Sequence, residues 1–233
     1  MRLRAILVLL ASLAFAVSPF LVSDFAGYDP TQFPVLIEEP PVQPAGYAFA
    51  IWGAIYLWLV VSAAFGLWKR AEDPAWDGTR LPLIVSLAIG AVWLAVAVAS
   101  PIWATILIWA MLAAALAALL RTSRADVWLL RAPLGLYAGW LTAASCVSLG
   151  VTAMGYGLPP FGPVGWSIAM LCLALAIAVA ILRIVPSPMY GAAVAWALIG
   201  VFVQNGADPV GLLAAGGAVA VAALTLWWGL DRA

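Results

Sequence analysis

Eight long apolar runs, none of which contains a charged residue or a histidine, constrain this chain more than any other feature of its sequence. A helix needs about 17–25 predominantly apolar residues to cross a bilayer, and each run meets that length. They lie at about residues 5–22, 45–67, 81–99, 101–120, 132–154, 164–182, 189–206 and 209–229. Only 9% of the residues are charged, against roughly a quarter in soluble domains. The sequence therefore predicts an all-α, polytopic integral membrane bundle of about eight transmembrane helices.

The charged residues lie between these runs, and their distribution orients the bundle. With the amino terminus inside, the internal segments hold all ten basic residues: Arg2, Arg4, Lys69, Arg70, Arg80, Arg121, Arg124, Arg131, Arg183 and Arg232. The external segments hold acids only: Asp24, Asp29, Glu38, Glu39 and Asp208. Because positive residues favour the cytoplasmic side, we expect both termini in the cytoplasm and the protein in the bacterial inner membrane.

The first run has a second interpretation. Arg2 and Arg4, an apolar stretch and then Ala14-Phe15-Ala16 also describe a secretory signal with a small-residue cleavage site. The apolar run continues to Val22, which is long enough to span a bilayer. A retained first helix is favoured, and cleavage of residues 1–16 is the alternative.

The longest external connection, residues 23–44, is acidic and rich in proline, but it also carries apolar side chains. These are Phe25, Tyr28, Phe33, Val35, Leu36 and Ile37. A loop that only contacts water has no need of them. They indicate either a lid folded onto the mouth of the bundle or an anchor in the membrane interface.

Aromatic side chains follow one face of the second run. Pro44-Ala45-Gly46 predicts a helix start, after which Phe49, Trp52 and Tyr56 recur at i, i+3 and i+7. Such a stripe commonly packs helix against helix. Its position under the proposed lid, and the need of a Tyr hydroxyl and a Trp N–H for partners away from water, favour a pocket.

The fifth run is the most polar. Tyr137 and Trp140 lie on one side, and Ser145, Ser148 and Thr152 share a face. Hydroxyls in membrane helices usually bond a backbone carbonyl or join helices, so a ligand contact is the alternative here. Gly135 and Gly139 form a Gly-x-x-x-Gly pattern, which permits close helix approach.

We therefore hypothesise a membrane-embedded pocket for a flat apolar small molecule, with aromatic walls and one or two hydroxyls. The predicted ligand-binding residues are Phe49, Trp52, Tyr56, Trp93, Tyr137, Trp140, Ser145 and Ser148. No catalytic or metal-binding residue is predicted.

Two other function classes compete with this hypothesis. A secondary transporter fits eight spans, although the absence of ionisable groups within the runs argues against familiar ion coupling. An enzyme is less favoured, because the chain has no histidine for a metal, a haem or a Ser-His triad. The pairs Cys146/Cys172 and Glu38/Glu39 are not accompanied by the further residues that a catalytic site needs. No basic patch suits nucleic acid.

The same aromatic residues resemble the translocator protein family, also called the TspO/MBR or tryptophan-rich sensory protein family. Its second helix begins Pro-x-Gly-aromatic-x-Phe and continues with Trp-x-x-x-Tyr, similar to Pro44, Gly46, Tyr47, Phe49, Trp52 and Tyr56. Its fifth helix carries Tyr-x-x-Trp and then a small residue, similar to Tyr137, Trp140 and Ala144, and Trp93 corresponds to a third-helix tryptophan.

The sequence departs from the family in three places. One residue fewer separates Phe49 from Trp52, and the family's asparagines of helices three and five fall near Gly90 and Ser148. The resemblance divides the chain into a five-helix core, residues 1–154, and three additional helices, residues 155–233, within one membrane domain.

The resemblance implies a receptor-like membrane protein with a sensory, regulatory or translocation role, commonly a homodimer. Its ligand would be a porphyrin or other tetrapyrrole, a sterol or a similar molecule. A bound porphyrin or haem would accordingly be a ligand and not a cofactor that the residues themselves require.

Overall fold

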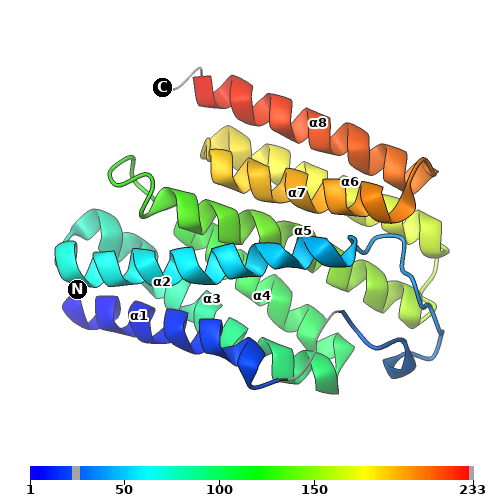
Figure 1. Ribbon diagram of the computed structural model, residues 1–233, viewed down its shortest axis with the longest axis horizontal. Helices are drawn as coiled ribbons and strands as arrows, with labels where there is room; N and C mark the ends of the chain where they lie inside the picture. The colour runs from blue at the N-terminus through cyan, green and yellow to red at the C-terminus, as the bar shows by residue number, and fades with distance from the viewer. Residues whose placement is uncertain (23–26, 231–233) are drawn as a thin grey trace.

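The computed structural model confirms an all-helical bundle (Figure 1). Residues 1–22 and 27–230 are described; Asp24, Phe25 and Arg232, assigned above to a loop or a terminus, lie outside them. Eight long helices and no strand occur in these residues. They are α1 (Arg2–Val17), α2 (Ile51–Lys69), α3 (Pro74–Ala99), α4 (Pro101–Leu119), α5 (Arg131–Gly155), α6 (Pro163–Ile184), α7 (Pro188–Asn205) and α8 (Pro209–Leu230). The 3₁₀ turns are η1 (Ser18–Phe20), η2 (Pro30–Gln32) and η3 (Gly46–Ala50).

Proline opens most of these helices, because its missing N–H would be unpaired at the first helical position in any case. Five of the eight begin at Pro74, Pro101, Pro163, Pro188 and Pro209. The apolar runs 81–99 and 101–120 are joined by a tight turn: Ser100 ends α3 and caps α4, accepting from the Trp103 N–H at 3.4 Å. The predicted start at Pro44-Ala45-Gly46 is also present, as η3 leading into α2.

The prediction placed the start of the third helix too late in the sequence. α3 begins at Pro74 and not near residue 81, because the Asp73 carboxylate accepts from the Ala75 N–H at 2.9 Å and Pro74 follows it. Arg80, assigned above to an internal connecting segment, is therefore helical, as is Asp77.

Seven of the described helical segments are long and apolar enough to cross a membrane. Two of them include a 3₁₀ turn, Arg2–Phe20 and Gly46–Lys69. The exception among the eight helices is α7, which has 18 residues and ends in Gln204-Asn205. Seven such segments identify an integral membrane protein in contact with the lipid bilayer.

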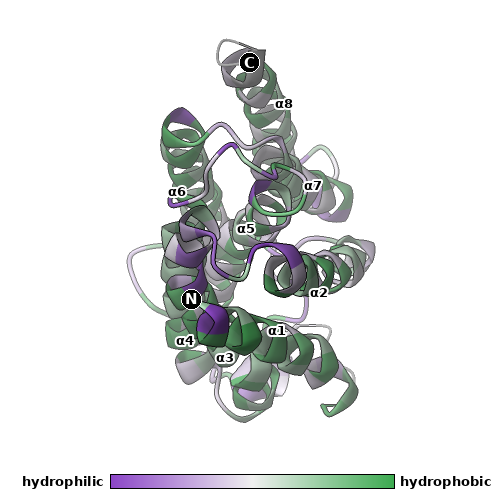
Figure 2. Ribbon diagram, turned by 90° about the vertical axis from the view of Figure 1, so that its left-hand side faces the viewer, coloured by the Kyte–Doolittle hydropathy of each residue, from purple (hydrophilic) through white to green (hydrophobic). Residues whose placement is uncertain are grey.

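Helix α5 lies at the centre of the bundle. In one group of contacts, α1 to α5 close a ring in the order α1-α2-α5-α4-α3; in the other, α5, α6, α8 and α7 pack together. Figure 2, viewed roughly along the helices, shows α5 in the middle. In an apolar stretch of 18 residues of α5, 83% of the residues are buried, against 28% to 44% in the corresponding stretches of the other six spans. The division of the chain after residue 154 stays a prediction, since α5 belongs to both groups.

Helices α5 and α7 approach closely at the Gly-x-x-x-Gly pattern of α5. A methyl group on Gly139 would lie 2.9 Å from the Ala193 Cβ and closer still to the Tyr190 carbonyl oxygen. A methyl group on Gly135 would meet the Ser187 hydroxyl and the Tyr190 backbone nitrogen. Both glycines are therefore needed for backbone contact between these helices, as such patterns provide in membranes.

The first residues of α1 and the last turn of α8 lie at one end of the bundle, opposite the long loop (Figure 1). At the same end, Arg70 Nε and Nη2 donate to the two Asp126 carboxylate oxygens at 2.7 and 3.1 Å, and the Trp76 indole N–H donates at 2.9 Å. These bonds join the α2–α3 connection to the α4–α5 connection. The Arg70 guanidinium, aided by Trp76, holds the pKa of Asp126 below its ordinary value.

Substitution of Gly139 by Ala should weaken the packing of α7 on α5. Overpacking typically costs about 1–3 kcal/mol, and thermal unfolding in detergent measures the loss. Gly53→Ala is the control, because a methyl group there meets nothing within 4 Å. Equal stability of the two variants would contradict the close approach.

The Asp126 cluster should give a defined pH dependence. A carboxyl whose pKa is lowered by folding stabilises the folded state above its unfolded pKa of about 3.9, and this contribution disappears as the pH falls through the lower, folded value. Asp126→Asn, which tolerates the φ of 52° at this position, should unfold more easily near neutral pH by about 1 kcal/mol or less. The difference from the native protein should shrink toward pH ~3; a constant difference would refute this account.

Candidate functional site

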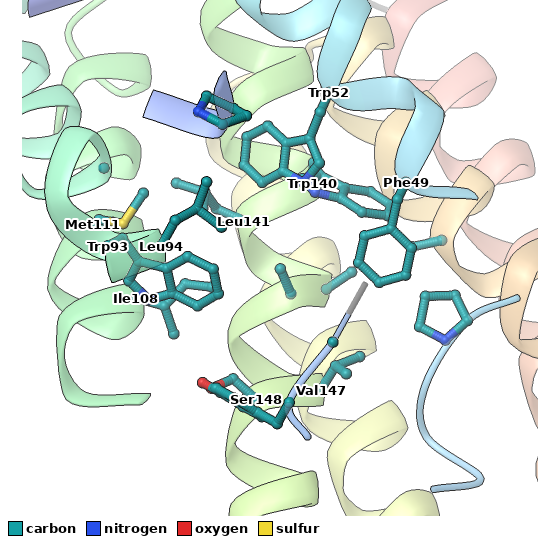
Figure 3. A pocket seen from close by; sticks show the side chains of 18 of the residues that line it. Phe49, Trp52, Trp93, Leu94, Ile108, Met111, Trp140, Leu141, Val147 and Ser148 are labelled. Atoms are coloured by element: carbon teal, nitrogen blue, oxygen red, sulfur yellow. The ribbon is translucent and has the colours of Figure 1, made fainter. Parts of the chain in front are cut away.

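A cavity of about 360 Å³ lies between α1, α2, α3, α4, α5 and α7, beneath the long loop (Figure 3). Its lining is mostly apolar. It comprises Phe15, Pro19, Val22, Gly27, Tyr28, Gln43, Pro44, Phe49, Trp52, Tyr56, Gly90, Trp93, Leu94, Ile108, Met111, Trp140, Leu141, Ala143, Ala144, Val147, Ser148, Val151 and Ala197. None of these side chains is an acid or a base of the Asp, Glu, Lys, Arg or His type.

Aromatic rings form one continuous wall. The Trp52 and Tyr56 rings of α2 are stacked, with centroids 5.3 Å apart, and the Trp140 ring of α5 meets Trp52 edge-on at 6.1 Å. The Phe49 ring also meets the Trp140 ring edge-on, with centroids 5.9 Å apart. Figure 3 shows the Phe49, Trp52 and Trp140 rings on one side of the cavity, with Trp93 on the facing side. The i, i+3, i+7 stripe of Phe49 in η3 and Trp52 and Tyr56 in α2 therefore faces the cavity.

Six of the eight predicted site residues line the cavity: Phe49, Trp52, Tyr56, Trp93, Trp140 and Ser148. Tyr137 and Ser145 are not among the lining residues. Tyr137 is fully buried and its hydroxyl bonds the Ser86 hydroxyl of α3 at 2.8 Å. Ser145 donates to the Ile108 carbonyl oxygen of α4 at 3.2 Å. Both polar groups join helices, the ordinary role of hydroxyls in a bundle.

Three polar groups of the aromatic wall make no hydrogen bond in the described part of the chain: the N–H groups of Trp52 and Trp140 and the hydroxyl of Tyr56. The buried indole N–H of Trp140 is unpaired, and no hydrogen bond involves the Tyr56 hydroxyl. A buried unsatisfied donor costs about 1–3 kcal/mol. By contrast, the Trp93 N–H donates to the Ala104 carbonyl oxygen at 2.8 Å. The wall thus holds one buried donor that the described residues leave unpaired.

One end of the cavity is polar. The Ser148 hydroxyl lies 2.7 Å from the Tyr28 hydroxyl of the long loop and 2.8 Å from the Thr105 hydroxyl of α4, which also bonds Thr152 at 2.8 Å. Burial raises the pKa of Tyr28 and outweighs these hydrogen bonds, so the phenol stays neutral. A chain of four neutral hydroxyls thus connects the loop to α4 and α5.

The described part of the long loop, residues 27–44, lies across the end of the bundle. Gln32 Nε2 donates to the Val98 carbonyl oxygen at 2.8 Å, the Val35 N–H to Gly155 at 2.9 Å, and Asn205 Nδ2 to Pro41 at 2.8 Å. These bonds attach the loop to α3, α5 and α7. The described geometry fits a cover over the cavity.

Several lining residues were not identified from the sequence. Phe15 of α1 packs on Tyr56 with ring centroids 4.9 Å apart, and Ala197 comes from α7. Phe15 lies in an apolar run and Ala197 in an Ala-rich one, so nothing in the sequence pattern distinguished either position as a lining residue. Tyr28 was distinguished, as an aromatic residue in an acidic loop.

The described residues contain no group of three or more His, Cys, Asp or Glu side chains that could hold a metal. Both cysteines are free thiols, Cys146 buried and Cys172 exposed.

Substitution of Tyr28 by Phe removes one hydroxyl from the chain of four and leaves the ring in place. We expect weaker attachment of the loop by about 0.5–1.5 kcal/mol, measured as faster amide hydrogen exchange over residues 27–44. Tyr47→Phe is the control, since Tyr47 is 45% exposed and makes no hydrogen bond in the described structure. Exchange that is equal in the two variants would show that the bond to Ser148 does not hold the loop.

Comparison with known proteins places these features in a family. No curated protein and no solved structure matches the chain. The family described as TSPO-like protein matches it over residues 5–228. That match runs from α1 into α8, so it includes the cavity, the long loop and the helices α6 to α8. The chain belongs to the TSPO-like protein family.

Proposed function

We propose that this protein binds a flat apolar small molecule in the cavity beneath the long loop. The observation that supports this most directly is the aromatic wall of Trp52, Tyr56, Trp140 and Phe49, in which one buried N–H lacks a partner. Small-molecule sites are typically apolar cavities of about 300–1,000 Å³ with a few directed polar groups. The cavity of about 360 Å³ falls at the lower end of that range.

The polar groups narrow the ligand class. Trp140 and Tyr56 are donors on one wall, and the hydroxyls of Ser148 and Tyr28 mark one end. A suitable ligand is a rigid, mainly hydrocarbon ring system that carries an acceptor such as a carbonyl, a carboxylate or a ring hydroxyl. Sterols and tetrapyrroles, which the family resemblance implies, meet this description. A tetrapyrrole would occupy the cavity with part of its ring and extend toward the loop.

The protein would have a sensory, regulatory or translocation role if binding of a ligand in the cavity changes the conformation of the long loop. Tyr28 lines the cavity and bonds Ser148, so a bound molecule and the loop share the same space. Ion-coupled transport is disfavoured because no lining residue is an acid or a base of the kind that such relays use. We further propose that both termini face the cytoplasm of a bacterial cell, since the basic residues cluster at that end. Homodimer formation remains a prediction from the family resemblance.

Replacing both tryptophans of the wall, Trp52→Leu with Trp140→Leu, should weaken ligand binding at least about tenfold, because aromatic contacts dominate such sites. The measurement is equilibrium binding to purified protein in detergent, followed by the absorbance of protoporphyrin IX and, separately, by a radiolabelled sterol.

The matched control replaces two lipid-facing tryptophans, Trp103→Leu with Trp227→Leu, which are 62% and 68% exposed. We expect it to bind as the native protein does. Equal affinities of the two double variants would remove the cavity as the binding site.

A further inference from the structure

Helix α7 contributes to the cavity although it lies outside the five-helix ring. Ala197 lines the cavity and is 3% exposed to the surroundings. The cavity is also lined by residues of α2 and α5, two helices whose contact with each other is limited. The side of the cavity between these two helices is therefore completed by a third one.

The same helix holds the segment that leads into α2, residues 44–49, here termed the approach segment. The Ala45 N–H donates to the Gly200 carbonyl oxygen at 3.0 Å, and the Trp196 indole N–H donates to the Ala48 carbonyl oxygen at 2.9 Å. The Tyr47 ring meets the Trp196 ring edge-on at 5.5 Å. Two hydrogen bonds and a ring contact thus join this segment to one helix.

The approach is close because Gly200 has no side chain. A methyl group there would lie 2.9 Å from the Cβ atoms of both Ala48 and Pro44. Pro44 and Phe49, at the two ends of the approach segment, are themselves lining residues. The position of α7 consequently sets the position of two cavity residues besides its own.

Helix α7 in turn packs closely against two other helices. It packs on α5 through Gly139 and on α8 through Gly191, where a methyl group would meet the Thr225 side chain. α8 and α6 pack against each other and complete this group. A wall supported on both sides cannot shift readily to admit a larger molecule, because close-packed interiors transmit strain.

We propose that α7 is the wall that limits the size of the bound molecule, with Ala197 as the specificity-determining residue and Trp196 as a positioning residue for the approach segment. This rests on the ligand-binding function proposed above. It assigns to the C-terminal helices a direct part in the site: α7 supplies Ala197 to the cavity and holds the approach segment, which supplies Pro44 and Phe49.

The size of the side chain at position 197 should therefore set ligand selectivity. Ala197→Phe should weaken binding of protoporphyrin IX at least about tenfold, because the ring enters a cavity that is already small. Ala197→Gly should change the ratio of porphyrin to sterol affinity in favour of the larger molecule. Ile199→Phe, on the lipid-facing side of the same helix with 43% exposure, should bind as the native protein does.

The outcomes separate this inference from the proposed function. If the double variant at Trp52 and Trp140 loses binding while Ala197→Phe and Ala197→Gly both keep the native affinities and their ratio, the cavity binds the ligand but α7 does not limit its size. If the native protein binds neither probe, the proposed function fails and the size limit fails with it. Where Ala197→Phe does not fold, the affinity ratio of Ala197→Gly decides.

A ligand-free measurement tests the positioning role. Trp196→Phe keeps a ring against Tyr47 and removes the N–H that bonds Ala48, so amide exchange in residues 45–50 should rise about fivefold or more, as the loss of one hydrogen bond allows. Trp103→Phe, a lipid-facing control, should leave that exchange unchanged. Native exchange in Trp196→Phe would overturn the positioning role of this residue.

Discussion

The arrangement of this bundle depends on where the polar groups of α5 can be satisfied. In a bilayer, apolar side chains gain little by leaving lipid, whereas an unpaired hydroxyl in hydrocarbon is costly. Ser145, Ser148 and Thr152 of α5 therefore contact α4, and Thr142 bonds the Tyr190 hydroxyl of α7 at 2.9 Å. These bonds run from α5 to α4 on one side and to α7 on another. Helix α5 is therefore enclosed by other helices, and helices with mostly apolar side chains lie at the periphery of the bundle.

Glycine provides the second condition for this arrangement. Gly135 and Gly139 let α7 reach the backbone of α5, and Gly200 lets the segment before α2 reach α7. The aromatic wall thus stands on elements whose spacing is fixed by backbone contact. A cavity survives there because rigid helices hold large rings at its edges and small residues, such as Ala143, Ala144 and Ala197, between them.

Periodicity was sufficient to predict which side chains before and within the first turns of α2 share the face that lines the cavity. Phe49, Trp52 and Tyr56 recur on one helical face, and only one side of a membrane helix can carry such a stripe inward. It was insufficient for α5, which is buried all round: Tyr137 and Trp140 are three residues apart, yet Trp140 lines the cavity and the Tyr137 hydroxyl bonds α3. On a helix with neighbours on every side, spacing does not say which neighbour a residue meets.

The sequence by itself determined that the chain is a membrane bundle, where most helices begin and which end of the bundle carries the basic residues. These properties depend on local apolar length, on proline and on charge, all of which can be read along the chain. Tertiary structure alone decided that Phe15 and Ala197 reach the same cavity as Trp52, and that Tyr28 closes its polar end. Helices within a bilayer associate through complementary shape and a few hydrogen bonds. Such a match is a property of two helix surfaces placed side by side, so it cannot be read from the residues of either helix alone.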